Sequence, residues 1–405
     1  MPSSQESNAV WTEQKVIAID GTEQAWFGLT IAIYGNTAMV GAMNAPVDGK
    51  PGQGAVYVFK KVGYVWQQTH KLVANDGMAG DQFGGAIALL GTTVVITAPL
   101  ARIDGKTWQG ATYVFSLSGT TWAQKQKLIA SNGTAYATFG KSVALNGNSL
   151  FIGAGGAGHV GSTIPRSVYV FRLLHQRNGD AWIERQILEA PNPHDLTSSF
   201  GTAIAVSDTT ALIGARSATI KSVLGQGAVY GYTDVNGNWT LTNTLLASDG
   251  AVRDNFGTSI ALLGSTALIG SPGVFKGPLS VGAVYRFDHK DGNWLQAQVF
   301  HAADTKAVNF GATVSRWNDE VLVGAYAADS YRGTAYVFQE QAGVWTQLQQ
   351  LVASDGTPGN VFGYTTALNA GTAMVGSFSA DVGGNADQGA VYFYNAPQVG
   401  GPGLG

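Results

Sequence analysis

The feature that most constrains the fold is a unit that recurs seven times along the 405 residues. The dipeptide Phe-Gly returns at intervals of 52 to 61 residues, and a tryptophan keeps the same spacing between its copies. A third marker, clearest as Gly-Ala-Val-Tyr-Val-Phe at Gly54–Phe59, accompanies them. The Phe-Gly copies begin at Phe27, Phe83, Phe139, Phe200, Phe256, Phe310 and Phe362, and the tryptophans are Trp11, Trp66, Trp122, Trp182, Trp239, Trp294 and Trp345. A period of this length indicates stacked supersecondary units that share one continuous core.

Each unit contains four short runs of strand-forming residues separated by turn residues, and none shows helical periodicity. In the second unit these runs are Phe83–Leu89, Val94–Ala98, Ala111–Phe115 and Trp122–Ile129. Seven four-stranded antiparallel sheets on this period favour radial closure, which leaves only short, protected sheet edges. The sequence therefore predicts an all-β, seven-bladed β-propeller that forms a single domain over residues 1–405.

The first run of each unit supports radial packing independently of the repeat count. Counted from each phenylalanine, the second, fourth and sixth residues are Gly, Ala, Ser or Thr in all seven copies. Alternate residues of a strand face opposite sides of a sheet, so one face of this strand is uniformly small and the other is bulky. We expect the small face of one blade to pack against the bulky face of its neighbour.

The two ends of the chain are expected to complete one blade together. Residues 10–19 form a strand with no preceding partners, whereas the last unit ends after only three strands. We predict that the N-terminal strand pairs with Val391–Tyr394 and closes the ring without a covalent link. Residues 396–405 are expected to form a flexible tail.

Composition excludes several classes of function. The formal net charge is −3 and only 12% of residues are charged, which argues against nucleic-acid binding because that requires clustered cations. The chain contains no cysteine, so it has neither disulfides nor thiolate chemistry. The sequence contains no run of eighteen apolar residues, so membrane insertion is not expected. Residues 1–10 lack the pattern of a signal peptide.

The repeated motifs resemble FG-GAP repeats, which integrin α-subunit head domains carry. The resemblance rests on Phe-Gly, on the Val-Tyr-Val-Phe strand and on a Leu-Ile-Gly-Ala-Pro-like strand between them, seen at Ile213–Ala215, Ile269–Pro272 and Val323–Ala325. It covers residues 11 to 394. The resemblance implies a seven-bladed propeller used in adhesion or ligand recognition, with an extracellular or cell-surface location.

One departure from that family bears on metal binding. Many FG-GAP blades hold calcium in an Asp-rich loop between their first two strands, but here that loop is short and has no carboxylate cluster, as at Leu90–Thr93. Asp234, Asn236 and Asn238 have calcium-like spacing, but they are better explained as a hairpin turn. His159 and His194 have no third ligand at a recognisable spacing. No metal or cofactor is therefore expected.

A ligand is expected on the face that carries the loops between the second and third strands, because these loops differ in length and chemistry. The loops are 43–53, 99–109, 155–166, 216–226, 272–281, 326–332 and 378–388. Trp26 and Trp108 lie outside the tryptophan repeat and fall on this face, with Arg102 and Lys106 nearby. Aromatic rings beside cations suit sugars or protein side chains. The candidate binding residues are Trp26, Trp108, Arg102, Lys106, Arg216, Tyr326, Tyr331 and Arg332.

Three functions fit these observations. The first is a non-enzymatic recognition or adhesion module for a glycan or protein ligand. The second is a propeller hydrolase or lyase, which would need converging acid and base groups near the axis. Lys141, Arg316 and Tyr364 are the polar exceptions on the inner strands, and they form no obvious acid–base pair. The third is a structural module of a larger surface or toxin assembly. The first is the prediction, so no catalytic residue is assigned.

Overall fold

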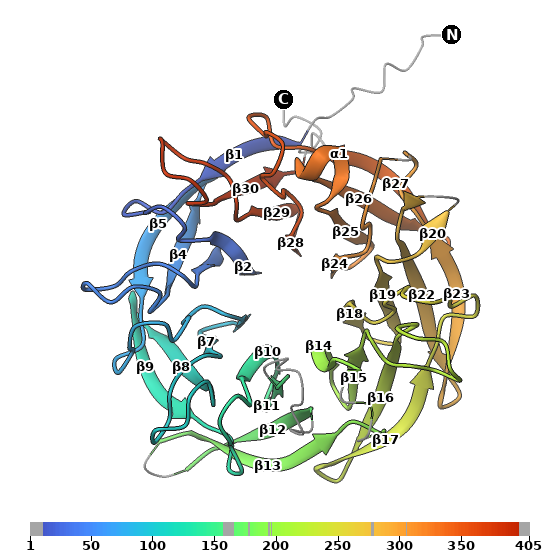
Figure 1. Ribbon diagram of the computed structural model, residues 1–405, viewed down its shortest axis with the longest axis horizontal. Helices are drawn as coiled ribbons and strands as arrows, with labels where there is room; N and C mark the ends of the chain where they lie inside the picture. Colours follow the sequence, from blue (N-terminus) through green and yellow to red (C-terminus); the bar gives the residue numbers. More distant parts are fainter. Residues whose placement is uncertain are drawn as a thin grey trace, which may run out of the picture.

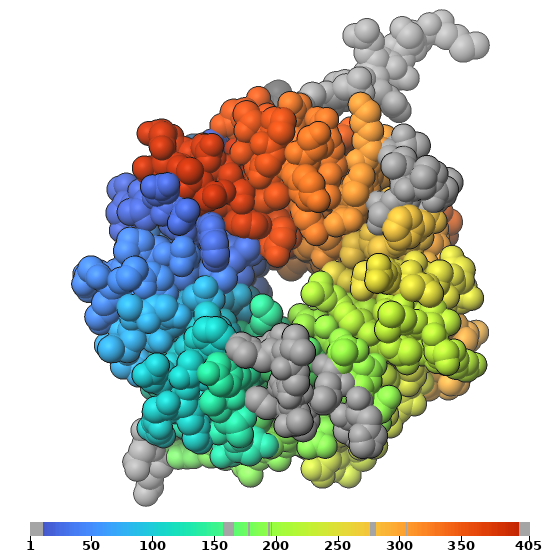
Figure 2. Space-filling model, in the orientation of Figure 1, coloured from blue at the N-terminus to red at the C-terminus, as the bar shows by residue number. Residues whose placement is uncertain are grey.

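The computed structural model describes residues 11–156, 166–176, 179–192, 195, 197–276, 279–304 and 306–396. Seven four-stranded antiparallel sheets stand as blades around a central opening, which is visible in both the ribbon and the space-filling views (Figures 1 and 2). In six blades the strands follow chain order from the innermost to the outermost. The predicted all-β seven-bladed propeller is confirmed.

The first three blades are built from consecutive strands. Blade 1 contains β2 (Phe27–Tyr34), β3 (Thr37–Ala42), β4 (Ala55–Val62) and β5 (Val65–Leu72). Blade 2 contains β6 (Ile87–Leu90), β7 (Thr93–Ala98), β8 (Ala111–Ser118) and β9 (Thr121–Leu128). Blade 3 contains β10 (Phe139–Asn146), β11 (Ser149–Ala154), β12 (Ser167–Leu174) and β13 (Ala181–Glu189).

The next three blades have the same plan. Blade 4 contains β14 (Phe200–Ser207), β15 (Thr210–Ala215), β16 (Ala228–Val235) and β17 (Asn238–Leu245). Blade 5 contains β18 (Ser259–Leu263), β19 (Thr266–Ser271), β22 (Ala283–Lys290) and β23 (Asn293–Phe300), with the short hairpin β20 (Phe275–Lys276) and β21 (Leu279–Ser280) inserted. Blade 6 contains β24 (Thr313–Trp317), β25 (Glu320–Ala325), β26 (Thr334–Gln341) and β27 (Val344–Leu351), with the single turn α1 (Ala328–Tyr331).

The seventh blade joins the two ends of the chain. It contains β28 (Thr365–Asn369), β29 (Thr372–Ser377), β30 (Ala390–Asn395) and, as its outermost strand, β1 (Thr12–Val16). β1 runs antiparallel to β30, with Thr12 opposite Asn395 and Val16 opposite Val391. The predicted closure is confirmed, although the strand is shorter than the expected 10–19. Residues 1–10 and 397–405, which include most of the predicted tail, lie outside the described residues.

The start of the inner strand differs from the prediction in blade 2. The expected strand began at Phe83, but β6 begins at Ile87. The backbone N–H groups of Gly84 and Gly85 both donate to the carbonyl oxygen of Thr97 in β7. Two residues before β6 therefore oppose one residue of β7, which interrupts the regular strand pairing. Blades 1, 3 and 4 show the same register shift directly after their Phe-Gly dipeptide. Phe-Gly therefore marks a bulge where the chain enters the inner strand.

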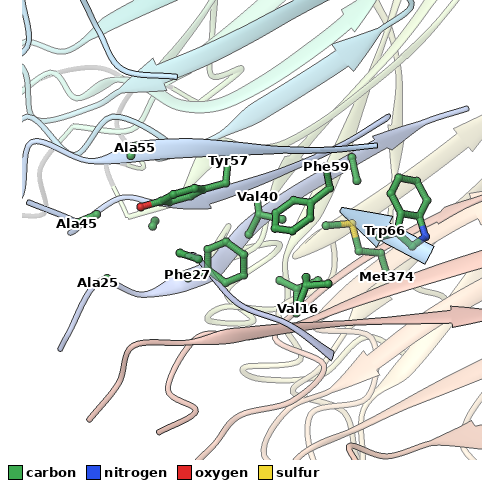
Figure 3. Close-up of a cluster of buried hydrophobic side chains, with 14 of the residues drawn as sticks. Val16, Ala25, Phe27, Val40, Ala45, Ala55, Tyr57, Phe59, Trp66 and Met374 are labelled. Carbon is green, nitrogen blue, oxygen red and sulfur yellow. The ribbon is translucent and has the colours of Figure 1, made fainter. Parts of the chain in front are cut away.

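The core lies between the blades, as the close-up of blades 1 and 7 shows (Figure 3). Phe27 is fully buried against Tyr57 and Phe59, and the Trp66 ring stacks on Phe393 of blade 7 at 4.5 Å. Six of the seven repeat tryptophans are buried, and Trp294 is half-buried. These tryptophans are core residues, as the repeat predicts.

Small residues on the inner strands allow neighbouring blades to approach closely. The hydroxyl group of Thr30 donates to the carbonyl oxygen of Gly84 in the next blade at 2.6 Å, and Thr365 does the same to Gly28 across the closed ring at 2.8 Å. A Cβ atom on Gly270 of the second strand would lie only 2.0 Å from the carbonyl oxygen of Gly311. The small face is therefore required by backbone contact between blades.

Candidate functional site

The loops between the second and third strands are more alike than the sequence analysis predicts. In blades 1, 2, 4 and 7 they have equal length and form the same small hairpin, closed by bridges such as Val47–Lys50 and Ile103–Lys106. Each hairpin is anchored by a buried glutamine, namely Gln53, Gln109, Gln226 or Gln388. A Cβ atom on the linker residue Gly77 would meet the Gln53 amide at 2.6 Å. The predicted variability is wrong for these four loops because their length is set by packing on the next linker.

Trp108 and Arg102 come together, as the sequence analysis expects. They line a surface pocket of about 330 Å³ with Met78 and Leu100. The Trp108 ring meets Tyr136 edge-on at 5.5 Å. Lys106 belongs to the scaffold instead, since its ammonium group donates to the carbonyl oxygen of Gly133 at 2.8 Å. Lys50 makes the equivalent bond to Gly77 in the preceding blade.

Trp26 and Trp108 are not brought together. Trp26 directly precedes Phe27 and meets Phe378 of blade 7 at 6.5 Å, whereas Trp108 reaches toward the linker that enters blade 3. Both residues have positive φ, 57° at Trp26 and 54° at Trp108. In this conformation their backbone groups form hydrogen bonds that link a loop to the adjacent linker: Trp26 N–H donates to Asp387, and the Trp108 carbonyl accepts from Thr138. The two tryptophans therefore belong to separate sites.

Two sets of equivalent positions surround the mouth of the central opening on the face of the second-to-third loops. One set follows each Phe-Gly dipeptide and consists of Leu29, Gly85, Lys141, Thr202, Thr258, Ala312 and Tyr364. The other set follows each second strand and consists of Met43, Pro99, Gly155, Arg216, Pro272, Tyr326 and Phe378. The two sets touch within a blade, since Tyr364 lies 4.7 Å from Phe378. None of these residues is a carboxylic acid or a histidine.

An aromatic wall occupies the side of the mouth formed by blades 6, 7 and 1. We define it as Trp26, Phe378, Tyr364 and Tyr326, whose successive ring centroids are 6.5, 4.7 and 5.2 Å apart. Tyr364 is 39% exposed, and the other three rings are half-buried. The Tyr326 hydroxyl accepts a hydrogen bond of 2.9 Å from the Asn309 side chain, which fixes the orientation of that ring. The wall is therefore a preorganised, partly exposed apolar surface.

A cationic wall faces it from blades 3 and 4. We define it as Lys141, Arg166 and Arg216. Lys141 and Arg166 both lie beside Gly155. A Cβ atom added to this glycine would be 3.5 Å from the Lys141 side chain and 3.6 Å from the Arg166 guanidinium. Burial and the charge of Arg216 lower the pKa values of both Lys141 and Arg166, while Asp195 partly offsets this effect at Arg166. The three cations are therefore close enough to repel one another.

The two walls lie on opposite sides of the opening. In Figure 1, β28, which directly follows Tyr364 of the aromatic wall, faces β10, which contains Lys141, and β14 of blade 4 across the centre of the ring. Burial and Tyr326 raise the pKa of Tyr364, and the positive charge of Arg216 opposes that rise. Arg216 is therefore within electrostatic range of the aromatic wall. The candidate binding residues taken from the sequence did not include Tyr364 and Phe378, although alignment of equivalent positions brings them out.

Tyr331 and Arg332 occupy a different place, in the short loop of blade 6. Arg332 lines a cavity of about 820 Å³ and pairs with Asp329 at 3.2 Å. Tyr331 is 55% exposed and does not line that cavity. The cavity forms where blade 6 lacks the hairpin that covers the linker in blades 1, 2, 4 and 7. The eight predicted residues are therefore distributed over several sites.

Asp234 and Arg316, two of the polar residues considered for metal binding or catalysis, have structural partners. Asp234 accepts the backbone N–H of Gly237 in its turn and pairs with Arg172. Arg316 binds Glu340 at 3.2 Å and lies over the Trp345 ring. His159 and His194 lie outside the described residues. Within the described ranges, no group of three acidic or histidine side chains could hold a metal ion, and no helix is long and apolar enough to cross a membrane.

Comparison with known proteins agrees with the repeat. The model of the FG-GAP repeat matches residues 11–59, 66–115, 122–171, 239–287 and 345–394, and each segment begins at a repeat tryptophan. The repeats that begin at Trp182 and Trp294 lie outside the matched segments. No curated protein matches the chain. Because the matched segments cover more than half of its length, this chain belongs to the FG-GAP repeat family.

Proposed function

We propose that this propeller is a non-enzymatic recognition module that binds a glycan or protein ligand at the mouth of its central opening. Its setting would be extracellular or at the cell surface, by analogy with the adhesion proteins that carry this repeat. The observation that supports the proposal is the aromatic wall. Four rings from three blades, one of them held by Asn309, are partly exposed beside one another, and burying them against a ligand would favour binding.

The chemistry of the mouth favours recognition over catalysis. General acid–base catalysis needs a proton donor and acceptor within hydrogen-bond reach of a substrate. The two sets of mouth residues include lysine, arginine, hydroxyl groups and aromatic rings but no carboxylate, and the nearby Asp195 accepts hydrogen bonds from Thr197 and Thr219. Arg316, the remaining polar exception on the inner strands, is engaged by Glu340. These residues can hold a ligand in place without transforming it.

The proposal can be tested with a glycan array and two matched variants. Trp26→Ala removes one end of the aromatic wall, whereas Trp108→Ala removes the same kind of side chain from the separate pocket beside Arg102. We expect the wild-type protein to bind a restricted set of glycans, Trp26→Ala to weaken that binding at least tenfold, and Trp108→Ala to leave it unchanged. EDTA should have no effect. Equal melting temperatures would show that both variants are folded.

Other outcomes would redirect the proposal. Loss of binding in Trp108→Ala alone would move the site to the 330 Å³ pocket. Absence of binding to every glycan would exclude the glycan ligand and leave a protein partner. A protein partner would then be sought by affinity capture with wild-type protein, with Trp26→Ala as the control. Turnover of a bound glycan would contradict the non-enzymatic assignment.

A further inference from the structure

The two walls of the mouth differ in chemistry in a way that narrows the ligand class. One side offers a row of aromatic rings, and the other offers Lys141, Arg166 and Arg216. Lys141 and Arg216 reach solvent, although the protein around Lys141 partly desolvates its ammonium group. Arg166 donates to the carbonyl oxygen of Gly155, which holds its guanidinium beside Lys141. A ligand that spans the mouth would therefore meet apolar surface on one side and positive charge on the other.

The cationic wall is unusual for this chain, whose formal net charge is −3. Several cations elsewhere in the propeller pair with carboxylates, as in Lys15–Asp355, Lys71–Asp20 and Lys127–Asp76. At the mouth, the nearby acidic group is Asp195, which receives the backbone N–H of Thr219 and the hydroxyl of Thr197. Asp195 partly offsets the effect of Arg216 on Arg166, and an anionic group from a ligand would reduce the repulsion among Lys141, Arg166 and Arg216.

We infer that the mouth binds an acidic carbohydrate, with the aromatic wall stacked on sugar rings and the cationic wall paired to their carboxylate or sulfate groups. This inference rests on the proposed function and specifies its ligand. A pyranose ring presents a flat C–H face, and an acidic sugar carries an anion on the same small unit. Three successive ring contacts between 4.7 and 6.5 Å make the wall longer than a single ring, which suits an oligosaccharide.

The test is isothermal titration of the whole protein with hexasaccharides that differ in charge. The probes are oligogalacturonate, chondroitin sulfate, the carboxyl-reduced form of the same oligogalacturonate, and hexaglutamate as an acidic peptide. We expect at least one acidic hexasaccharide to bind, with affinity that falls as salt rises. The carboxyl-reduced sugar and hexaglutamate should bind at least tenfold more weakly.

Substitutions in the cationic wall test whether its residues bind the acidic groups of the sugar. Arg216→Ala and Lys141→Ala should each weaken binding of the acidic sugar about tenfold or more, because a hydrogen bond between charged groups would be lost. Arg185→Ala and Lys125→Ala are the matched controls, since both residues are exposed on the outer strands β13 and β9. These two controls should bind like the wild-type protein. Tyr364→Ala should weaken binding of the acidic and the carboxyl-reduced sugar alike.

Each contrary result has a separate meaning. If the carboxyl-reduced sugar binds as well as the acidic one and Arg216→Ala has no effect, the acidic ligand is excluded while the glycan-binding function stands. If hexaglutamate binds as tightly as the sugars, the ligand is an acidic peptide and the carbohydrate inference is wrong. If neither acidic hexasaccharide binds, the inference fails, and the glycan array decides independently whether the proposed function fails with it.

Discussion

Each Phe-Gly phenylalanine is completely buried, and six of the seven meet two aromatic side chains of the third strand in their own blade. Phe256 is typical, with edge-on contacts to Tyr285 at 5.4 Å and Phe287 at 5.8 Å. The glycine that follows has positive φ, 88° at Gly257, and its peptide lies against the backbone of Ala228. This pair therefore fixes the inner strand in place.

Replacing Phe256 with alanine should destabilise the protein by about 3–5 kcal/mol, because the substitution removes buried surface and leaves a cavity among rigid rings. Chemical denaturation measures the effect. Tyr64→Ala is the control: that side chain is 64% exposed in a turn, and its loss should change the unfolding free energy by no more than about 0.5 kcal/mol. Equal stability of the two variants would contradict the assigned core.

Neighbouring outer strands are joined by polar side chains that recur between blades. The amide group of Gln14 in β1 both donates to and accepts from the backbone of Trp66, at 2.8 Å each way. Gln126, Gln186 and Gln298 do the same to the tryptophans of the blades that follow them. Within a blade, Lys15 of β1 and Tyr392 of β30 both bind Asp355, at 2.6 and 2.7 Å. These contacts hold the closing strand by its side chains as well as its backbone.

The Asp355 contacts predict an acid-sensitive contribution to stability. Burial acts to raise the pKa of Asp355, but hydrogen bonds from Lys15 and Tyr392 and the charge of Lys15 outweigh it and lower the pKa overall. A lowered folded-state pKa stabilises the protein above the unfolded value, about 3.9, and that contribution is lost as pH falls through the folded value. Asp355→Asn should therefore be less stable than the wild-type protein at pH 7, with a difference that shrinks below about pH 4.

Denaturant titrations at pH 7, 5 and 3 would measure this difference. Asp291→Asn is the control, because Asp291 is an exposed turn residue with a φ of 52°, a conformation that asparagine also adopts. Its difference from the wild-type protein should stay constant with pH. A constant difference for Asp355→Asn as well would show that Lys15 and Asp355 do not interact in solution.

At the scale of the whole molecule, the ring depends on a strand from the opposite end of the chain. β1 supplies the outer edge of blade 7 and contacts both its neighbours. Glu13 accepts hydrogen bonds from Tyr394 and Ser354 of blades 7 and 6, and Gln14 reaches Trp66 of blade 1. The chain has no disulfide to take over this role. Closure is therefore noncovalent and cooperative with folding.

Deleting residues 1–20 should expose the edge of β30 and promote aggregation or unfolding, because unpaired backbone groups at a sheet edge pair with other chains. Size-exclusion chromatography with light scattering measures the outcome. Deletion of residues 1–10 is the control, since it keeps β1 (Thr12–Val16) intact and should leave a monomeric, stable ring. A monomeric protein of unchanged stability after the longer deletion would contradict the closure mechanism.

The sequence alone predicted the fold because the repeat places the same residue types at the same step of every blade. Phe-Gly, the repeat tryptophan and the small inner face each report a local requirement, namely a bulge, a ring between blades, or a close backbone approach. Such requirements depend on near neighbours, so they remain visible in a linear pattern. Closure by β1 was also predictable, because the N-terminal strand had no sheet to join and the last unit had only three of its four strands.

Only the tertiary structure decided how the candidate site residues are grouped. The sequence places Trp26 and Trp108 on one face of the ring, yet they meet different partners, Phe378 and Tyr136. Lys106 resembled a ligand cation but holds a linker carbonyl. The mouth draws Tyr364, Phe378 and Arg216 from blades far apart in sequence. Local pattern determines each blade, whereas the distance between side chains on different blades depends on how the ring closes.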